Sequence, residues 1–300
     1  MIDLEQMVDL ELSVTGQHQR YSGTLAGQRT LSSLACAHLA ADEIAEPRAA
    51  TEPEEFLPPE ASTSVEINAE LEAQAVRLRA VHTPQRSYFS GTDVAFSVAA
   101  DGSNAQLTHC ALDQELWLFG PALILALARL GIYCLHASAY SEGATASVIV
   151  GNSGAGKSTL ARAIRGRAGA LRLCDDITPI TLRAGKLYVL PRFPQLKLTT
   201  VDQNLPEAVP LKRLILLNAA QAGTASAHQN LSPRAVFDAL MRHTVASRLY
   251  SDADTRVWWQ QLPQMMAALV LARSIRPAFD AHAPESAMLA ALDALDTLCA

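Results

Sequence analysis

Lysine is almost missing from this chain, since only four of its 300 residues are lysine against twenty arginines. The 24 basic residues face 30 acidic ones, so the formal net charge is −6 at pH 7. A chain without a basic excess lacks the charge that would hold nucleic acid or an anionic membrane surface. We therefore expect neither nucleic acid nor a membrane among its partners.

Cysteine is also sparse, with five residues, an odd number, and no C-x-x-C spacing. This pattern indicates neither a disulfide framework nor a zinc site. His82, His109, His228 and His282 show no metal-ligand spacing. Free thiols suit a reducing compartment. The first residues show no basic segment followed by an apolar one, so no signal peptide is expected and we predict a cytoplasmic protein.

Long hydrophobic runs are absent as well. The most apolar stretch, Leu116 to Ala128, ends after 13 residues and contains Gly120 and Pro121. That length is too short for a membrane-spanning helix. A buried helix that begins at Pro121 and ends before Gly131 is the prediction here, because proline suits the first turn of a helix and glycine the position after its end.

The first part of the chain has the pattern of β-strands. Val8–Val14, Asp93–Ala99 and Gln106–Leu112 are short runs of strand character. Between the first two lies Glu43–Thr63, which is rich in proline and glutamate and has no periodic apolar residues, so we predict an exposed linker. Residues 1–112 are predicted to form a smaller, β-containing N-terminal domain.

Residues 113–300 alternate between strand and helix patterns. Strands are predicted at Ile132–Tyr140, Ala144–Val150, Ala170–Cys174 and Arg213–Asn218. A helix is predicted at Lys157–Ile164, and the chain from Arg234 onward is mostly helical in pattern. Such alternation is typical of an α/β fold with a partly parallel sheet.

The stretch GNSGAGKST follows one of these strands and opens the predicted helix. It matches G-x-x-x-x-G-K-[ST], the loop whose backbone N–H groups surround the phosphates of a nucleotide. Lysine contacts the β- and γ-phosphates there, and the next hydroxyl ligates Mg²⁺. The predicted nucleotide-binding residues are Gly151, Asn152, Ser153, Gly154, Ala155, Gly156, Lys157, Ser158 and Thr159.

Asp175 and Asp176 follow the next predicted strand, Ala170–Cys174. In a parallel crossover that strand ends beside the loop, so both carboxylates are expected to face the phosphates. One of them suits Mg²⁺ and the other suits a proton from an attacking hydroxyl. His136 lies toward the end of the stretch IYCLHAS, in the predicted strand Ile132–Tyr140, and a histidine at a strand end is either structural or part of the same site.

Several other features have a structural alternative. Arg162, Arg165, Arg167 and Arg172 form either a solvated face or a contact to an acidic substrate. The segment with Arg242, His243 and Arg248 contains a candidate transition-state arginine, and the pair Trp258–Trp259 is expected in a core or interface. An ATPase or GTPase switch is disfavoured because no guanine-reading or S-G-G-Q-type motif is present, whereas a non-catalytic nucleotide-binding regulator stays open.

The stretch LHASAYSEGATASVIVGNSGAGKSTLARAI, followed by LRLCDD, resembles the C-terminal kinase domain of HPr kinase/phosphorylase. That resemblance covers roughly Leu116 to Ile180 and implies an HPr-kinase-like P-loop domain over 113–300 that uses ATP and Mg²⁺. It implies catalytic roles for Lys157 and for Asp175 as the general base, supported by His136. Ser158 and Asp176 would then hold the metal.

The segment Leu190–Leu198, LPRFPQLKL, stands where that family has a glutamate-containing metal-binding segment. It resembles divergent HPr-kinase-like proteins of biosynthetic gene clusters, including kinases of lasso-peptide precursors. This implies ATP-dependent phosphorylation of a serine-type hydroxyl on a peptide. The alternatives are a serine kinase/phosphorylase of an HPr-like carrier protein and the non-catalytic regulator, and a homo-oligomer is compatible with the sequence.

Overall fold

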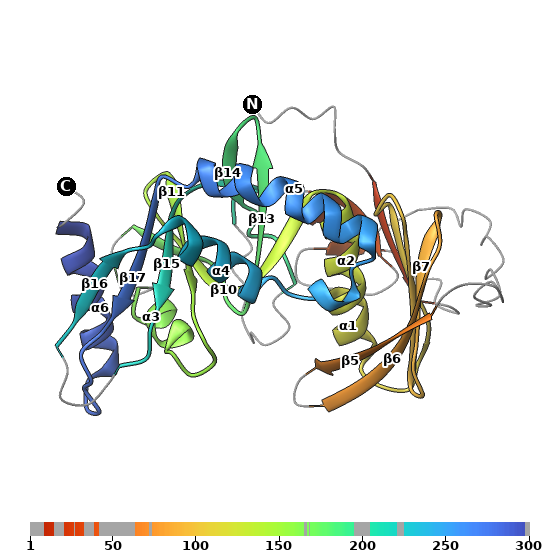
Figure 1. Ribbon diagram of the computed structural model, residues 1–300, viewed down its shortest axis with the longest axis horizontal. Helices are drawn as coiled ribbons and strands as arrows, with labels where there is room; N and C mark the ends of the chain where they lie inside the picture. The colour runs from red at the N-terminus through yellow and green to blue at the C-terminus, as the bar shows by residue number, and fades with distance from the viewer. Residues whose placement is uncertain are drawn as a thin grey trace. The chain divides into compact units, whose positions relative to one another are not determined.

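The structure is a computed structural model, shown in Figure 1. It describes residues 9–14, 21–26, 28–32, 39–41, 64–71, 74–164, 167, 169–194, 205–220 and 225–297. The predicted linker Glu43–Thr63 lies outside these residues. The chain divides into two compact units, Met1–Ile132 with Ala246–Val257, and Tyr133–Val245 with Trp258–Ala300. The domain boundary at 112–113 stays a prediction.

The first unit contains a nine-stranded sheet in the order β4-β2-β3-β1-β9-β8-β7-β6-β5. β1 runs parallel to β3 and β9, and the other pairs are antiparallel. Phe89 and Phe96 stack in its core, with ring centroids 4.7 Å apart. The strands are β1 Leu10–Val14, β2 Tyr21–Leu25, β3 Gln28–Ser32, β4 Leu39–Ala41, β5 Ser64–Leu71, β6 Gln74–His82, β7 Arg86–Ser90, β8 Val94–Ala99 and β9 Asn104–Cys110.

The apolar run of this unit is helical and buried, but it begins earlier than predicted. Helix α1 (Gln114–Trp117), the π-helical segment η2 (Leu118–Ala122) and α2 (Leu123–Arg129) follow one another. The start predicted at Pro121 is wrong, because the Asp113 side chain caps the segment by accepting a hydrogen bond from Leu116 N at 3.2 Å. Pro121 lies inside, next to the non-helical Gly120.

The predicted end of that helix is confirmed. Gly131 follows it with a φ of +73°, a left-handed conformation that glycine adopts without strain.

Within the described residues, the structure has no helix of sufficient length and hydrophobicity to span a membrane.

The second unit contains the predicted partly parallel sheet, so the α/β fold class is confirmed. Its order is β11-β10-β13-β14-β15-β17-β16, and in addition β12 pairs with β10 and β11 with β15. β11, β15 and β17 run parallel to one another. The strands are β10 Ile132–Glu142, β11 Thr145–Val150, β12 Ala170–Cys174, β13 Ile177–Arg183, β14 Lys186–Val189, β15 Val209–Leu217, β16 Ala227–Asn230 and β17 Leu271–Arg276.

The position of β12 relative to the glycine loop follows from its pairing with β10. The strand before the glycine loop (Gly151–Thr159) is β11. β12 does not lie next to β11, because β10 lies between these two strands and pairs antiparallel with both. β11 and β12 therefore still run in the same direction, and their carboxyl ends share one edge of the sheet.

The chain after Arg234 is helical as predicted over α4 (Pro233–His243), α5 (Asp252–Ala268) and α6 (Pro284–Thr297), with the short η3 (Ser247–Leu249) between α4 and α5. It also contains a strand that the pattern did not predict, β17, which pairs with β15 and β16. A short apolar-polar run of this kind does not distinguish strand from helix by its periodicity.

Helices α3 (Lys157–Ile164) and α6 cover one face of this sheet. Leu160 of α3 and Leu292 of α6 share a buried cluster with Ile149, Ile215 and Ile275 from β11, β15 and β17. Each fully buried side chain of this size contributes about 1.5–3 kcal/mol. The cluster therefore fixes the start of α3, and with it the glycine loop, against the three parallel strands.

Candidate functional site

The glycine loop joins β11 to α3, and the structure explains its three glycines. Gly154 and Gly156 have φ values of +77° and +98°, which disfavour any residue with a Cβ. At Gly151 a Cβ would lie 2.5 Å from the Leu217 carbonyl oxygen at the end of β15. Turning and close strand packing thus both require glycine, and the backbone is free to surround a phosphate.

Lys157 is the first residue of α3 and folds back over this loop. Its Nζ donates hydrogen bonds to the carbonyl oxygens of Gly151 at 2.8 Å and Asn152 at 3.3 Å. Burial lowers the pKa of the ammonium group, while Asp176 and Asp175 act in the opposite direction. The amine is held at the loop, where the negative charge of a phosphate would offset its desolvation.

Asp175 directly follows β12 and accepts two hydroxyl hydrogen bonds. Ser138 of β10 donates to Asp175 Oδ1 at 2.7 Å, and Ser158 of α3 donates to the same oxygen at 3.3 Å. The carboxylate therefore joins β12, β10 and the first turn of α3. The family resemblance pairs the Ser158 hydroxyl with Asp176 at the metal, whereas the hydrogen bond of this hydroxyl goes to Asp175.

Asp176 pairs instead with His136. The distance from His136 Nδ1 to Asp176 Oδ1 is 3.3 Å, and both side chains are partly exposed. Asp176 has a left-handed φ of +79°, and its carbonyl oxygen accepts a hydrogen bond from Ala137 N at 3.1 Å. This turn places the carboxylate over β10, in reach of the histidine.

The strand register explains why His136 lies at this edge. Ala137 stands opposite Val150, the last residue of β11, so His136 lies beside the start of the glycine loop. The histidine is not at the end of its strand as predicted, because β10 continues to Glu142. Its proximity to the loop follows from the pairing of β10 with β11.

His243 is a further histidine near the loop, and it ends α4 in a buried position. Burial lowers its pKa to about 4, with further lowering by the positive charges of Lys157, His136 and Arg242. The imidazole is therefore neutral at pH 7 in the neighbourhood of the P-loop lysine.

A cavity of about 240 Å³ separates the loop from α4. Asn152 and Ser153 line it from the loop, and Asp238, Arg242 and His243 line it from the helix. The space beside the glycine loop is thus bordered by the side chains of an aspartate and an arginine and by a neutral imidazole.

From the sequence, Arg242 and His243 are recognisable only as part of a segment that contains a candidate transition-state arginine. The proximity of this segment to the loop depends on how α4 packs, so no local spacing signals it. Arg248, from the same segment, belongs to the other compact unit.

The arginines after the loop have structural partners. Arg162 lies 3.8 Å from Glu285, and Arg167 pairs with Glu142 at 3.0 Å and with Asp293. Arg165 lies outside the described residues. These contacts support the structural alternative for Arg162 and Arg167.

The tryptophan pair divides between core and surface. Trp258 is buried against Tyr133, with ring centroids 4.2 Å apart. Trp259 is exposed and lies 5.4 Å from Phe237, measured between ring centroids. The expectation of a core position is therefore met by Trp258.

The donor set fits Mg²⁺ in part. Ser158 Oγ and the Asp175 carboxylate supply hard oxygen ligands, which Mg²⁺ prefers. Among the described residues, no group of three or more His, Cys, Asp or Glu side chains could hold a metal ion. A magnesium ion would therefore need phosphate oxygens and waters to complete its shell, as is common for this ion in nucleotide sites.

No family model and no curated protein match the sequence. Among solved structures, the chain is similar to the Hpr(Ser) kinase/phosphatase from Coxiella burnetii, with 11% sequence identity and a TM-score of 0.28. The match covers 55% of this chain and 97% of that chain. A similarity with this TM-score does not support an assignment of function. The function is therefore inferred from the geometry of the site.

Proposed function

We propose that the protein is an ATP- and Mg²⁺-dependent phosphotransferase that phosphorylates a hydroxyl group. One observation carries the proposal. At a single edge of the sheet, the P-loop lysine, the Ser158–Asp175 pair and the His136–Asp176 pair come together from α3, β12 and β10. Phosphoryl transfer requires a phosphate site, a metal site and a group that orients the acceptor, and candidates for all three are available here.

The loop and Lys157 would hold the phosphates. Backbone N–H groups at the start of α3 add the positive end of the helix dipole. The Lys157 ammonium, now bonded to the carbonyls of Gly151 and Asn152, would exchange these contacts for phosphate oxygens. Its position at the loop limits the movement that this exchange needs.

The contacts support different roles for the two aspartates from those that the resemblance implies. Asp175 shares a hydrogen bond with the Ser158 hydroxyl, and a hydroxyl beside an aspartate is the arrangement that holds Mg²⁺ in P-loop proteins. When bound, Mg²⁺ supplies positive charge that neutralises the phosphate oxygens. Asp176 is paired with His136 and would act as the base. The resemblance assigns these two roles the other way round.

The proposed transfer step accounts for each bond and for the proton of the acceptor. The acceptor oxygen forms a bond to the γ-phosphorus while the bond from that phosphorus to the bridging oxygen breaks, and ADP leaves. The hydroxyl proton passes to Asp176, and His136 orients that carboxylate through its contact at 3.3 Å. An alcohol suits this site better than a carboxylate, because only the alcohol must lose a proton.

We propose a serine on a peptide as the acceptor, with an HPr-like carrier protein as the second choice. The support is the resemblance of Leu190–Leu198 to lasso-peptide kinases. Of that segment the structure describes Leu190–Pro194, where Leu190 N donates to Pro179 O at 3.0 Å and Phe193 is buried. Its first residues are thus anchored on β13, which pairs with β14.

The test incubates the protein with ATP, Mg²⁺ and a serine-containing peptide, or with HPr, and detects the added phosphoryl group by mass spectrometry. Lys157→Ala should abolish most of the transfer, since it removes the phosphate-binding ammonium. Lys186→Ala is the matched control, because this exposed lysine lies in the β13–β14 hairpin. Nucleotide binding without transfer to any acceptor would favour the non-catalytic regulator, and normal transfer by Lys157→Ala would refute the assigned site.

A further inference from the structure

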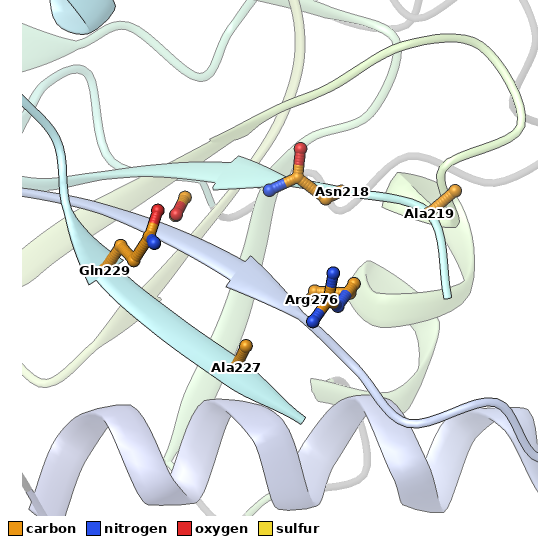
Figure 2. A pocket seen from close by; sticks show the side chains of 6 residues that line it. Asn218, Ala219, Ala227, Gln229 and Arg276 are labelled. Carbon is orange, nitrogen blue, oxygen red and sulfur yellow. The ribbon is translucent and has the colours of Figure 1, made fainter. Parts of the chain in front are cut away.

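A second cavity lies at the carboxyl edge of the same sheet. It has a volume of about 330 Å³ and is lined by Asn218, Ala219, Ala227, Gln229, Ser274 and Arg276. Figure 2 shows the side chains of Asn218, Gln229 and Arg276 grouped around this space. They come from three different chain segments, because Asn218 directly follows β15, Gln229 lies in β16 and Arg276 ends β17. The volume is at the small end of the range for small-molecule sites.

This cavity, which we call the β15–β17 cavity, adjoins the glycine loop. Asn218 and Ala219 line both it and the cavity that contains Asn152 and Ser153. The carbonyl of Leu217, one residue before Asn218, lies against Gly151. A ligand whose phosphates lie on the loop can therefore extend into the β15–β17 cavity.

The direction of a bound nucleotide follows from the proposed transfer, on which this inference rests. The attacking and leaving oxygens lie roughly in line on opposite sides of the transferred phosphorus. Asp175, Asp176 and His136 lie on the β10–β12 side of β11. The leaving ADP should then extend to the other side of β11, where β15 and β17 end.

We propose that the β15–β17 cavity binds the adenosine part of the nucleotide, with the base read by the amides of Asn218 and Gln229. A side-chain amide offers a donor and an acceptor side by side, which matches the exocyclic amine of adenine and its neighbouring ring nitrogen. Arg276 Nε is buried and has no hydrogen-bond partner among the described residues. A ring nitrogen or a ribose oxygen would supply the acceptor that this group requires.

The lining favours adenine over guanine. Guanine presents two adjacent donors, which a carboxylate matches best. No aspartate or glutamate occurs among the six residues that line this cavity in the described part of the chain.

The experiment compares two ligands by calorimetry on the full-length protein with Mg²⁺. ADP fills both the loop and the β15–β17 cavity, whereas inorganic triphosphate fills the loop alone. Gln229→Leu and Arg276→Met each remove polar groups from the cavity. Asn230→Leu is the matched control, because it is exposed, follows Gln229 in β16 and alternates to the other face of the strand.

We expect Gln229→Leu and Arg276→Met to weaken ADP binding by roughly threefold to tenfold each, the range for a lost hydrogen bond. Triphosphate binding should be unchanged in both, and ADP binding unchanged in Asn230→Leu. Equal affinity of the unaltered protein for ADP and triphosphate, or an equal loss of both ligands in the variants, would overturn the inference. Tighter binding of GDP than ADP would refute the choice of adenine. Failure of the unaltered protein to bind either ligand would instead refute the proposed function itself.

Discussion

Two neighbouring aspartates, Asp175 and Asp176, have different surroundings at the level of single residues. Asp175 accepts hydrogen bonds from Ser138 and Ser158, whereas Asp176 lies against His136 in a left-handed turn. One strand end can therefore supply two separate functions. The hydroxyl partners suit a carboxylate that binds a metal ion, and the histidine partner suits one that accepts the proton of a substrate.

Replacing each aspartate by asparagine distinguishes the two roles. Asp176→Asn should lower kcat by about 10²-fold or more, the general scale for an acid–base group, with little change in ATP affinity. Asp175→Asn should raise the Mg²⁺ concentration needed for half-maximal activity, because it removes a charged metal ligand. The measurement is steady-state kinetics at several Mg²⁺ concentrations.

Asp93→Asn is the control for these two variants, because Asp93 is an exposed residue of the other compact unit. The opposite pattern, with a normal Mg²⁺ requirement and a lost kcat in Asp175→Asn, would restore Asp175 as the base. That result would agree with the family resemblance and contradict the assignment drawn from the contacts.

Among the secondary-structure elements, the β13–β14 hairpin contains a locally unfavourable residue. Arg183 pairs with Lys186, so Ala184 and Gly185 form a two-residue turn, with φ values of +48° and +72°. Two positive φ values correspond to a type I′ turn, which favours Asn-Gly. Alanine in a left-handed conformation costs roughly 1–2 kcal/mol.

Ala184→Asn should therefore stabilise the protein, by about 0.5–1 kcal/mol, because asparagine tolerates this conformation better. Urea unfolding is the measurement. Ala184→Val is the opposing variant and should destabilise, since a β-branched residue is disfavoured at positive φ. A stability change of the same sign in both variants would show that backbone conformation is not the cause.

Across the whole molecule, the N-terminal strands depend on residues that come much later in the chain. β1 runs beside β9 and pairs over four residues from Glu11 to Val14. The segment predicted to be an exposed linker, Glu43–Thr63, separates these strands in sequence. A single cut in that segment should therefore leave the two fragments associated.

Limited digestion with a glutamate-specific protease tests this prediction. The segment contains several glutamates, and its proline-rich, weakly apolar composition predicts that the first cuts fall there. Mass spectrometry would identify the fragments, and size exclusion under native conditions should show them eluting together. Glu142, held by Arg167 and Arg213, is an internal control that should resist cleavage. First cuts there, with Glu43–Thr63 protected, would contradict the linker assignment.

The local parts of this protein follow from the order of its residues alone. The sequence predicts the glycine loop, the helix Lys157–Ile164 and the strand Ala170–Cys174. In the structure, the helix and the strand have the predicted bounds. These features depend on glycine conformation, on turn geometry and on short-range apolar patterns, all of which lie within a few residues. For the same reason, Lys157 and the Asp175–Asp176 pair are recognisable as candidate site residues from their spacing along the chain.

Which of these residues meet depends on the tertiary structure. The insertion of β10 between β11 and β12 brings His136 to Asp176 and Ser138 to Asp175. The packing of α4 brings a buried histidine to the neighbourhood of the P-loop lysine, and the unpredicted β17 supplies an arginine to the β15–β17 cavity. Strand order and helix packing depend on burial shared by distant segments, and no local pattern encodes that pairing.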